Sequence, residues 1–505
     1  MFLFRQSLTL SAAAQKKAGS GQSAGKRQHP ESSSMYRIAV LLLTGNMAGS
    51  LLLFLRNLVV ARLVSVEDYG IAATFAISMA VVEMASGLGL QSLIVQDKGG
   101  DDPRLQAGLQ GFNLLRGLVS AVVLFLLAHP IARFLGIPEI AWAYQLLALV
   151  PALRGFEHFD IFRLSRRLRF KPMMLSKVLP ALVSVLSIWP LHYFVGGYKV
   201  MLYAILIQWG LWLIICHLIA ERSYQISFAG DIMRRGLRFG WPVMINNILL
   251  FMVFQGDKLI VGREFDMETL AIFAMGFTLT LTPTLVLSAS EQQFYLPQLS
   301  AAVEDHKGFS NLALAAMQTS LVSGLLLVLG ISLLGAPVVY FLLGDKYEAL
   351  IPLLIWLSIL QALRTFKIGG ITAALARAQT GNAGIANSFR VLALPFAWHV
   401  AASGGELVHI IWIAIAGELC GYIATLFLVV RRLHVNLRRM RLPLLTAGAI
   451  LIVTAVGALG PPKEQPAWNT LVAAVLFLVA LRTMSELRFY ILNRTMTKHS
   501  VERTE

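Results

Sequence analysis

Arg-Asn-Leu-Val-Val-Ala-Arg at residues 56–62 has a counterpart, Asp-Lys-Leu-Ile-Val-Gly-Arg, at residues 257–263. Each stretch ends a long apolar segment, in which Asn46 precedes Asn57 and Asn247 precedes Lys258 by the same eleven residues. Because eleven residues at about 100° each make close to three full turns, each pair lies along one stripe of a helix. The repeat predicts two related halves that enclose a polar path, an arrangement typical of membrane transporters.

The composition points the same way. Of 505 residues, 57% are hydrophobic and 14% are charged. A soluble protein of this size would need more charge to cover its surface, so we expect an all-α polytopic membrane protein. About fourteen apolar runs are long enough to cross a bilayer, and the loops between them leave no room for a soluble catalytic domain. These runs lie near residues 37–62, 70–95, 107–128, 139–158, 173–195, 199–219, 241–262, 268–291, 311–334, 348–366, 384–402, 408–430, 442–460 and 468–488.

The basic residues predict the orientation of these spans. If the N-terminus is cytoplasmic, 30 of the 43 Lys and Arg residues fall on the cytoplasmic side, 6 on the opposite side and 7 within spans. Lys367 and Arg377 are counted here in a cytoplasmic loop. This bias favours an even number of spans with both termini cytoplasmic. It also accounts for the net charge of +16, so a nucleic-acid partner has no support.

The spans divide the chain into five segments. Residues 1–35 are rich in Ser, Gly, Lys and Arg and are expected to be a disordered, dispensable N-terminal extension. Residues 36–230 and 231–432 are expected to form two pseudo-symmetric six-helix bundles. Residues 433–490 would add two C-terminal helices, and residues 491–505 a cytoplasmic tail.

One motif resembles a known family. Residues 61–70, Ala-Arg-Leu-Val-Ser-Val-Glu-Asp-Tyr-Gly, are similar to a turn after the first span of bacterial polysaccharide flippases. These are the Wzx-type members of the multidrug/oligosaccharidyl-lipid/polysaccharide exporter superfamily. Residues 257–263 resemble the segment that opens their second half. Ser65-Val66 departs from the family's usual Gly-Pro, and residues 56–62 also resemble lipid II flippases, a sister family.

The resemblance implies a function as well as a fold. Such a protein would flip an undecaprenyl-pyrophosphate-linked oligosaccharide across the bacterial inner membrane by alternating access. Its partners would be this lipid-linked oligosaccharide, membrane lipid, and possible polysaccharide polymerase and chain-length proteins. No cofactor and no metal are expected, and the two cysteines, Cys216 and Cys420, fall in apolar runs without metal-ligand spacing.

Moving a pyrophosphate through a bilayer requires groups that replace its water. Arginine suits this purpose because its planar fork can bond two phosphate oxygens at once. Structural ion pairing between helices and, toward span ends, snorkelling are the competing explanations for each cation. The candidate substrate-binding residues within the spans are Arg56, Arg116, Arg390 and Lys258, with the amides Asn46, Asn57 and Asn247.

Other charged residues in the spans have different expected roles. Arg154, Lys177 and Arg364 lie within a few residues of the cytoplasmic boundary, so snorkelling is expected for them. Glu83 and Glu418 lie near mid-span, where a carboxyl is paired or protonated, and are the candidates for ion coupling. Asp257 is expected to pair with a neighbouring helix.

Four different functions stay open at this stage. A polytopic enzyme would need a long outer loop or an acidic metal motif, and neither is evident. A cation-coupled multidrug exporter of the same superfamily would be expected to carry acids in the first span, which holds Arg56 instead. A lipid II-type flippase and a scaffold for envelope assembly also stay open.

Overall fold

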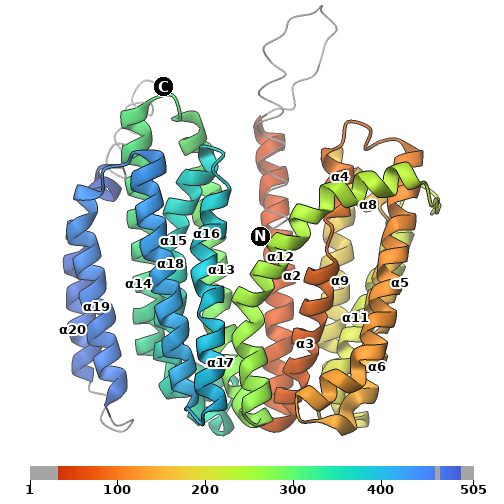
Figure 1. Ribbon diagram of the computed structural model, residues 1–505, viewed down its shortest axis with the longest axis horizontal. Helices are drawn as coiled ribbons and strands as arrows, with labels where there is room; N and C mark the ends of the chain where they lie inside the picture. Colours follow the sequence, from red (N-terminus) through yellow and green to blue (C-terminus); the bar gives the residue numbers. More distant parts are fainter. Residues whose placement is uncertain (1–31, 461–466, 491–505) are drawn as a thin grey trace, which may run out of the picture. The chain divides into compact units, whose positions relative to one another are not determined.

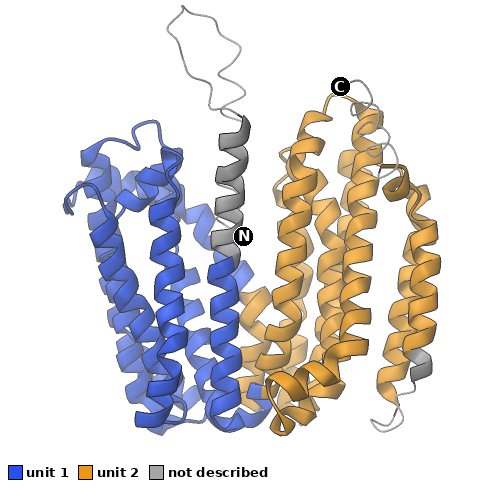
Figure 2. Cartoon of the chain, turned by 180° about the vertical axis from the view of Figure 1, so that it is seen from behind, with its two compact units in different colours: residues 1–251, 265–271 blue, residues 252–264, 272–505 orange. Residues whose placement is uncertain are grey.

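The computed structural model describes residues 32–460 and 467–490, with side chains described for residues 48–84, 86–460 and 470–490. Within these ranges every regular element is a helix. The chain divides into two compact units, coloured separately in Figure 2. Unit 1 comprises residues 1–251 and 265–271, and unit 2 comprises residues 252–264 and 272–505.

Unit 1 is a bundle in which α2 packs along α9, and α5 along α6 and α7 (Figure 1). α12 continues into unit 2, and the first residues of α13 return to unit 1. The elements of unit 1 are α2 (Ser32–Leu63), α3 (Val66–Ser86), α4 (Leu90–Gln96), α5 (Pro103–Phe134), η2 (Pro138–Ile140), α6 (Ala141–Leu147), α7 (Leu149–Gly155), α8 (Asp160–Arg166), α9 (Lys171–Leu186), α10 (Ile188–Phe194), α11 (Lys199–Ile219) and the first part of α12 (Gly230–Glu264).

Unit 2 is built around α15, which packs along α14 on one side and α18 on another. Its hydrophobic core runs from α14 through α15 to α19 and α20. The elements of unit 2 are the end of α12, most of α13 (Met267–Ala301), α14 (His306–Leu342), η3 (Asp345–Leu350), α15 (Ile351–Ala376), α16 (Gly381–Leu392), α17 (Leu394–Ala402), α18 (Leu407–Leu433), η4 (Leu437–Met440), α19 (Arg441–Leu459) and α20 (Ala467–Thr483).

The expected spans coincide with these helices. Each of the fourteen runs falls on one helix or on consecutive helices, and nine described helices are by themselves long and apolar enough to cross a membrane. The prediction of a polytopic all-α membrane protein is therefore confirmed. The boundary between two six-helix bundles at residue 231 stays a prediction, as do the two extra helices as a separate segment. The N-terminal extension lies almost wholly outside the described residues.

The second expected span, 70–95, is interrupted. α3 ends at Ser86 and α4 begins at Leu90, and Gly89 between them has φ +61°, in the left-handed region that glycine adopts without strain. A helix break exposes carbonyl groups that a continuous helix would have bonded. α12 passes close by, since a Cβ at Gly240 would lie 2.5 Å from the Leu88 carbonyl oxygen. The break therefore creates acceptors inside unit 1 that other side chains must satisfy.

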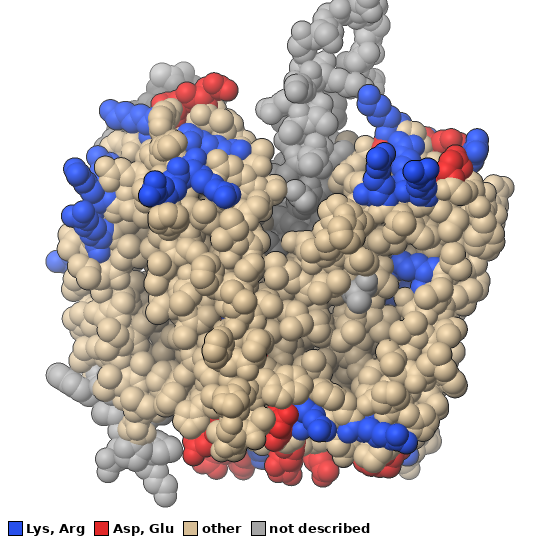
Figure 3. Space-filling view, in the orientation of Figure 1, with Lys and Arg blue, Asp and Glu red and all other residues tan. Residues whose placement is uncertain are grey.

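Few charged side chains lie at mid-height on the face drawn in Figure 3. On the face drawn in Figure 3, the belt between the helix ends of each unit is almost entirely uncharged, and one basic patch interrupts it at mid-height on unit 1. Such a belt fits a hydrocarbon environment. The prediction that Lys367 lies in a cytoplasmic loop is wrong. α15 extends past the expected end of the span, and Lys367 is buried within this helix at 3% exposure. A paired carboxylate makes this position tolerable, as described below.

Candidate functional site

A polar pocket lies inside unit 1, among α3, α5 and α7. It contains about 240 Å³ of space without protein atoms, part of it open to the surroundings. Its charged lining residues are Glu83 on α3, Arg116 on α5 and Arg154 on α7. Two residues with separate predicted roles, one substrate-binding and one ion-coupling, thus meet in one pocket. The other lining residues are Met79, Val82, Ser86, Gly117, Ser120 and Pro151.

Arg116 is held by groups that the helix break exposes. Its Nη1 donates to the carbonyl oxygen and to the hydroxyl of Ser86, each at 3.2 Å, and its Nη2 donates to Asn113 Oδ1 at 2.8 Å. Ser86 is the last residue of α3, so its carbonyl is one of those released by the break. No carboxylate pairs with Arg116 among the described residues. Its buried Nε has no protein hydrogen-bond partner. The fork is therefore fixed in place, and one N–H group is buried without a protein partner.

Arg154 shares the pocket with a carboxylate. It forms an ion pair with Glu83, and its guanidinium carbon lies 4.5 Å from the centroid of the Trp209 ring on α11. The side chains of Arg154 and Glu83 are 22% and 37% exposed, so the pair is accessible from the pocket. This placement corrects the snorkelling prediction for Arg154. The carboxylate and the aromatic face hold the guanidinium inside the bundle, where it need not reach the interface. Its Nε is also buried without a partner.

A second acid, Glu157, lies near the two arginines. Glu157 is 3% exposed, follows α7, and accepts a hydrogen bond of 3.0 Å from Gln91 Nε2. It interacts electrostatically with Arg154, Arg116 and Lys177. Three cations thus face the two acids Glu83 and Glu157, which leaves the neighbourhood with one excess positive charge. The sequence offered no signal for Glu157, because it lies at the end of an expected span beside a loop.

Two other predicted residues, Arg56 on α2 and Asn247 on α12, bond to α11 and to the helix break. Arg56 Nη1 donates to Gln208 Oε1 on α11, and its Nε is buried without a partner. Asn247 Nδ2 donates to the Gly87 carbonyl oxygen at 3.1 Å, the second carbonyl of the break. Asn57 is half-buried on α2. The side chain of Asn46 lies outside the described residues.

Unit 2 contains a different arrangement, a buried ion network centred on Glu418 of α18. Glu418 is fully buried and accepts from Arg364 Nε at 2.6 Å and from Lys367 Nζ. Both cations lie on α15. Arg364 is only 7% exposed, so the snorkelling prediction is wrong for this residue as well. A helix can carry these two buried charges because Glu418 neutralises them across the α15–α18 contact.

The remaining predicted residues of unit 2 adjoin this network. Arg390 on α16 is fully buried, pairs with Asp257 on α12, and has its Nε 3.9 Å from Glu418 Oε1. The prediction that Asp257 pairs with a neighbouring helix is confirmed. Lys258 points elsewhere, with its Nζ 4.7 Å from the centroid of the Phe277 ring. The network as a whole carries three cations and two anions, all with little or no exposure.

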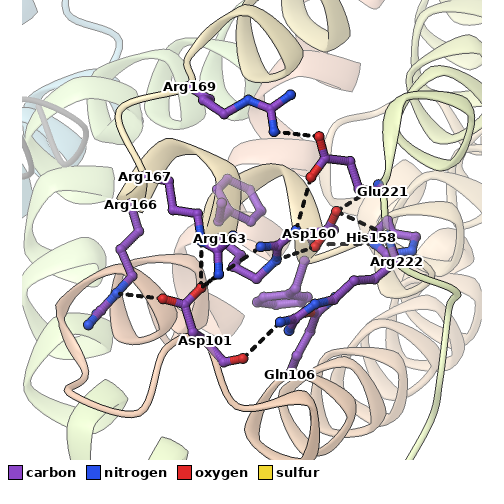
Figure 4. Close-up of polar contacts among 12 residues, drawn as sticks. Asp101, Gln106, His158, Asp160, Arg163, Arg166, Arg167, Arg169, Glu221 and Arg222 are labelled. Atoms are coloured by element: carbon purple, nitrogen blue, oxygen red, sulfur yellow. Dashed lines mark hydrogen bonds and ion pairs between the residues drawn. The ribbon is translucent and has the colours of Figure 1, made fainter.

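A third polar cluster closes one end of unit 1 (Figure 4). Asp160 is fully buried and accepts from Arg163 Nε at 2.5 Å and from the backbone amide of Glu221 at 2.8 Å. Burial alone would raise the pKa of Asp160, but the hydrogen bond from Arg163 and those from backbone amides outweigh it, and the pKa is lowered. Asp101 pairs with Arg167 at 3.0 Å in the same cluster. These contacts hold α8 and the residue after it to the loop that contains Asp101 and to the segment that follows α11.

The fold and the charges inside its spans define a polytopic, all-α membrane protein. A family described as polysaccharide biosynthesis protein matches residues 59–352, more than half of the chain, and the chain belongs to this family. The resemblance to Wzx-type flippases of the exporter superfamily is thereby confirmed. The chain is 22% identical over 324 residues to the succinoglycan biosynthesis transport protein ExoT of Rhizobium meliloti. This match covers 61% of the chain but only 62% of that relative, less than two thirds of its length.

Two further comparisons agree with this assignment. The chain is 22% identical over 307 residues to the amylovoran biosynthesis protein AmsL of Erwinia amylovora, covering 59% of the chain and 74% of AmsL. Among solved structures, the lipid II flippase MurJ in an inward closed conformation has a TM-score of 0.66 and 14% identity. That comparison covers 90% of this chain and 99% of MurJ, and at this identity it shows a shared fold.

Proposed function

We propose that this protein is a flippase that moves a lipid-linked oligosaccharide, joined through pyrophosphate to a polyprenyl carrier of the undecaprenyl type, across the bacterial inner membrane. The observation that carries the proposal is the pocket of unit 1, in which two arginines lie deep between helices with buried N–H groups that lack protein partners. The membership of the polysaccharide biosynthesis family supports the saccharide cargo.

The pocket suits an anionic headgroup better than a cation. Each unpartnered arginine N–H is a donor that costs free energy as long as it stays buried and unbonded. A pyrophosphate oxygen accepts such donors through charge-assisted bonds that are stronger than neutral ones. The excess positive charge around Arg116 and Arg154 attracts the same ligand, whereas a cationic drug would be repelled. Ser86, Ser120 and Glu83 offer the hydroxyl and carboxylate groups that hydrogen-bond sugar hydroxyls.

Alternating access supplies the mechanism of this proposal. The polar headgroup would occupy the protein interior while the polyprenyl tail stays in lipid, since the belt of each unit is almost entirely uncharged on the face shown. The excess of Lys and Arg in the corresponding loops supports a cytoplasmic location for both termini. The acids that the sequence suggested for ion coupling, Glu83 and Glu418, would then act as counter-ions of arginines.

The proposal is tested in cells that lack the chromosomal copy of this protein. Arg116→Ala should reduce surface polysaccharide and raise the amount of lipid-linked precursor in the inner leaflet. Loss of one charge-assisted bond of about 1.5–3 kcal/mol corresponds to roughly ten- to hundredfold weaker headgroup binding. Arg133→Ala is the matched control, because Arg133 lies on the same helix but is exposed near its end. Full polysaccharide in the Arg116→Ala strain, at equal protein level, would remove this pocket from the mechanism.

A further inference from the structure

Glu291 is an intramembrane carboxyl that has no cation beside it in the described part of the chain. It lies on α13, is 8% exposed, and forms no ion pair with any described Lys or Arg. Its Oε1 is buried without a hydrogen-bond partner. The two mid-span acids Glu83 and Glu418 differ in this respect, because Glu83 pairs with Arg154 and Glu418 with the α15 cations. A buried carboxylate without a counter-ion is costly and is neutralised most cheaply by taking up a proton.

The hydrogen-bond donors around Glu291 are neutral hydroxyls, which do not replace a counter-ion. Glu291 Oε2 lies 2.6 Å from the hydroxyl oxygen of Ser320 on α14. That hydroxyl oxygen also accepts from the backbone N–H of Gly369 on α15, at 2.9 Å, and lies 3.1 Å from the Ala316 carbonyl oxygen. Ser320 has only one proton to donate. The shorter contact is the one with Glu291, so Ser320 donates to Oε2 while the buried Oε1 stays without a partner, and a full negative charge on the carboxyl would be poorly compensated.

Among the described residues, the cations of the neighbouring helices contact other groups; Lys258 on α12, for example, lies over the ring of Phe277 on α13, fourteen residues before Glu291. On α14 the second polar neighbour is the hydroxyl of Ser323. On α15 the two cations, Arg364 and Lys367, are both bonded to Glu418. On α13 itself, Tyr295 directs its hydroxyl to Thr319 at 2.7 Å. The surroundings of Glu291 therefore consist of hydroxyl and apolar groups.

We propose that Glu291 is a proton-binding site, and that binding and release of this proton are coupled to the conformational change of transport. The proton comes from water and returns to water, with one O–H bond formed and broken on the carboxyl. A metal cation fits less well, because it requires a shell of several oxygen ligands, and Ser320 is already bonded to Gly369. Only the coupling to transport rests on the proposed function; the proton-binding site stands on the contacts alone.

The site controls a contact among three helices. Ser320 joins α13 to α15 through Glu291 on one side and Gly369 on the other. α15 and α14 approach closely there, since a Cβ at Gly369 would lie 2.6 Å from backbone atoms of Met317. Ionisation of Glu291 would place a negative charge there with one neutral donor on Oε2 and no donor on Oε1. Loss of the proton would thus drive α13 away from α14.

Infrared spectroscopy of the purified full-length protein at neutral pH tests the proton-binding site. Protonated carboxyls give a carbonyl-stretch band separate from that of carboxylates. The parent and Glu268→Gln should both show the band that Glu291→Gln lacks; Glu268 is an exposed acid in the first turn of the same helix. Ser320→Ala keeps the acid and should shift the band to higher frequency, because one hydrogen bond is removed. A difference spectrum in which Glu291→Gln loses a carboxylate band would overturn the proposal.

Proteoliposomes test the coupling. They carry a fluorescent polyprenyl-pyrophosphate-linked disaccharide, and its flipping rate is measured with and without an imposed pH gradient. The gradient should accelerate flipping by the parent and by Glu268→Gln, and leave the rate of Glu291→Gln unchanged. An undiminished response of Glu291→Gln, or a parent that responds to sodium and not to pH, would refute the coupling. If the parent does not flip the probe at all, the proposed function fails, and the infrared band still decides the proton-binding site.

Discussion

Removing Arg390 alone should destabilise unit 2 far more than removing Arg390 together with Asp257. Arg390 is fully buried and is the ion-pair partner of Asp257. Arg390→Met keeps much of the volume but leaves Asp257 buried at 3% exposure without its partner. Breaking a buried pair from one side typically costs about 3–5 kcal/mol, because the remaining charge is uncompensated. Asp257→Asn should cost a similar amount, since it leaves Arg390 with Glu418 Oε1 only at 3.9 Å.

The double variant separates pairing from packing. Arg390→Met with Asp257→Asn removes one charge of each sign, so Arg364, Lys367 and Glu418 keep their contacts and the net charge of the network is unchanged. Its free energy of unfolding should lie within about 1 kcal/mol of the parent, because a buried pair replaced by neutral groups is often nearly neutral in stability. The free energy of unfolding of the parent, the two single variants and the double variant is measured by reversible unfolding in mixed detergent micelles. Single variants as stable as the parent, or a double variant as unstable as the two losses added, would refute this account of Arg390.

The remaining predictions concern stability and ligand binding. The pKa of Asp160 is lowered from its ordinary value of 3.8, so its ionised form stabilises the fold above that pH, and this stabilisation is lost as the pH falls below it. Asp160→Asn should therefore have a lower melting temperature than the parent at neutral pH. An equal difference in melting temperature well below pH 3.8 would contradict this. Gly369→Ala should lower the melting temperature by several degrees, because its Cβ would lie 2.6 Å from Met317 backbone atoms, and an unchanged melting curve would show that α14 and α15 can separate at no cost. Glu83→Gln should impair the retention of a pyrophosphate probe less than Arg154→Gln, as judged by equilibrium binding to the purified protein, and the reverse order would be inconsistent with an anionic ligand.

Sequence periodicity located the helices well, because apolar runs of about twenty residues leave few possible structures in a membrane protein. Gly87 and Gly89 lie within the second expected span, and the structure breaks the helix there. The sequence could not show which groups the break would expose. Arg116 and Asn247 bond two of the carbonyls at the break from other helices, and only the tertiary fold brings these groups together.

The charged residues of the spans were harder to interpret. Distance from a span end suggested snorkelling for Arg364 and a loop position for Lys367. Both predictions failed for one reason: Glu418, on another helix, compensates their charges inside the bundle. A single sequence carries no information on such pairings. The same limit explains why the sequence assigns no role to Glu291, since its distinguishing feature is the absence of a counter-ion among described residues.

The central claim is that arginines in the unit 1 pocket replace the water around a pyrophosphate headgroup. The most direct measurement compares, in proteoliposomes, the flipping rates of one disaccharide carried by a polyprenyl pyrophosphate and by an uncharged polyprenyl ether. The account predicts that the parent flips the pyrophosphate form, that Arg116→Ala loses most of this rate, and that the uncharged form crosses no faster than in protein-free vesicles. Equal rates for the two carriers, unaffected by Arg116→Ala, would contradict it.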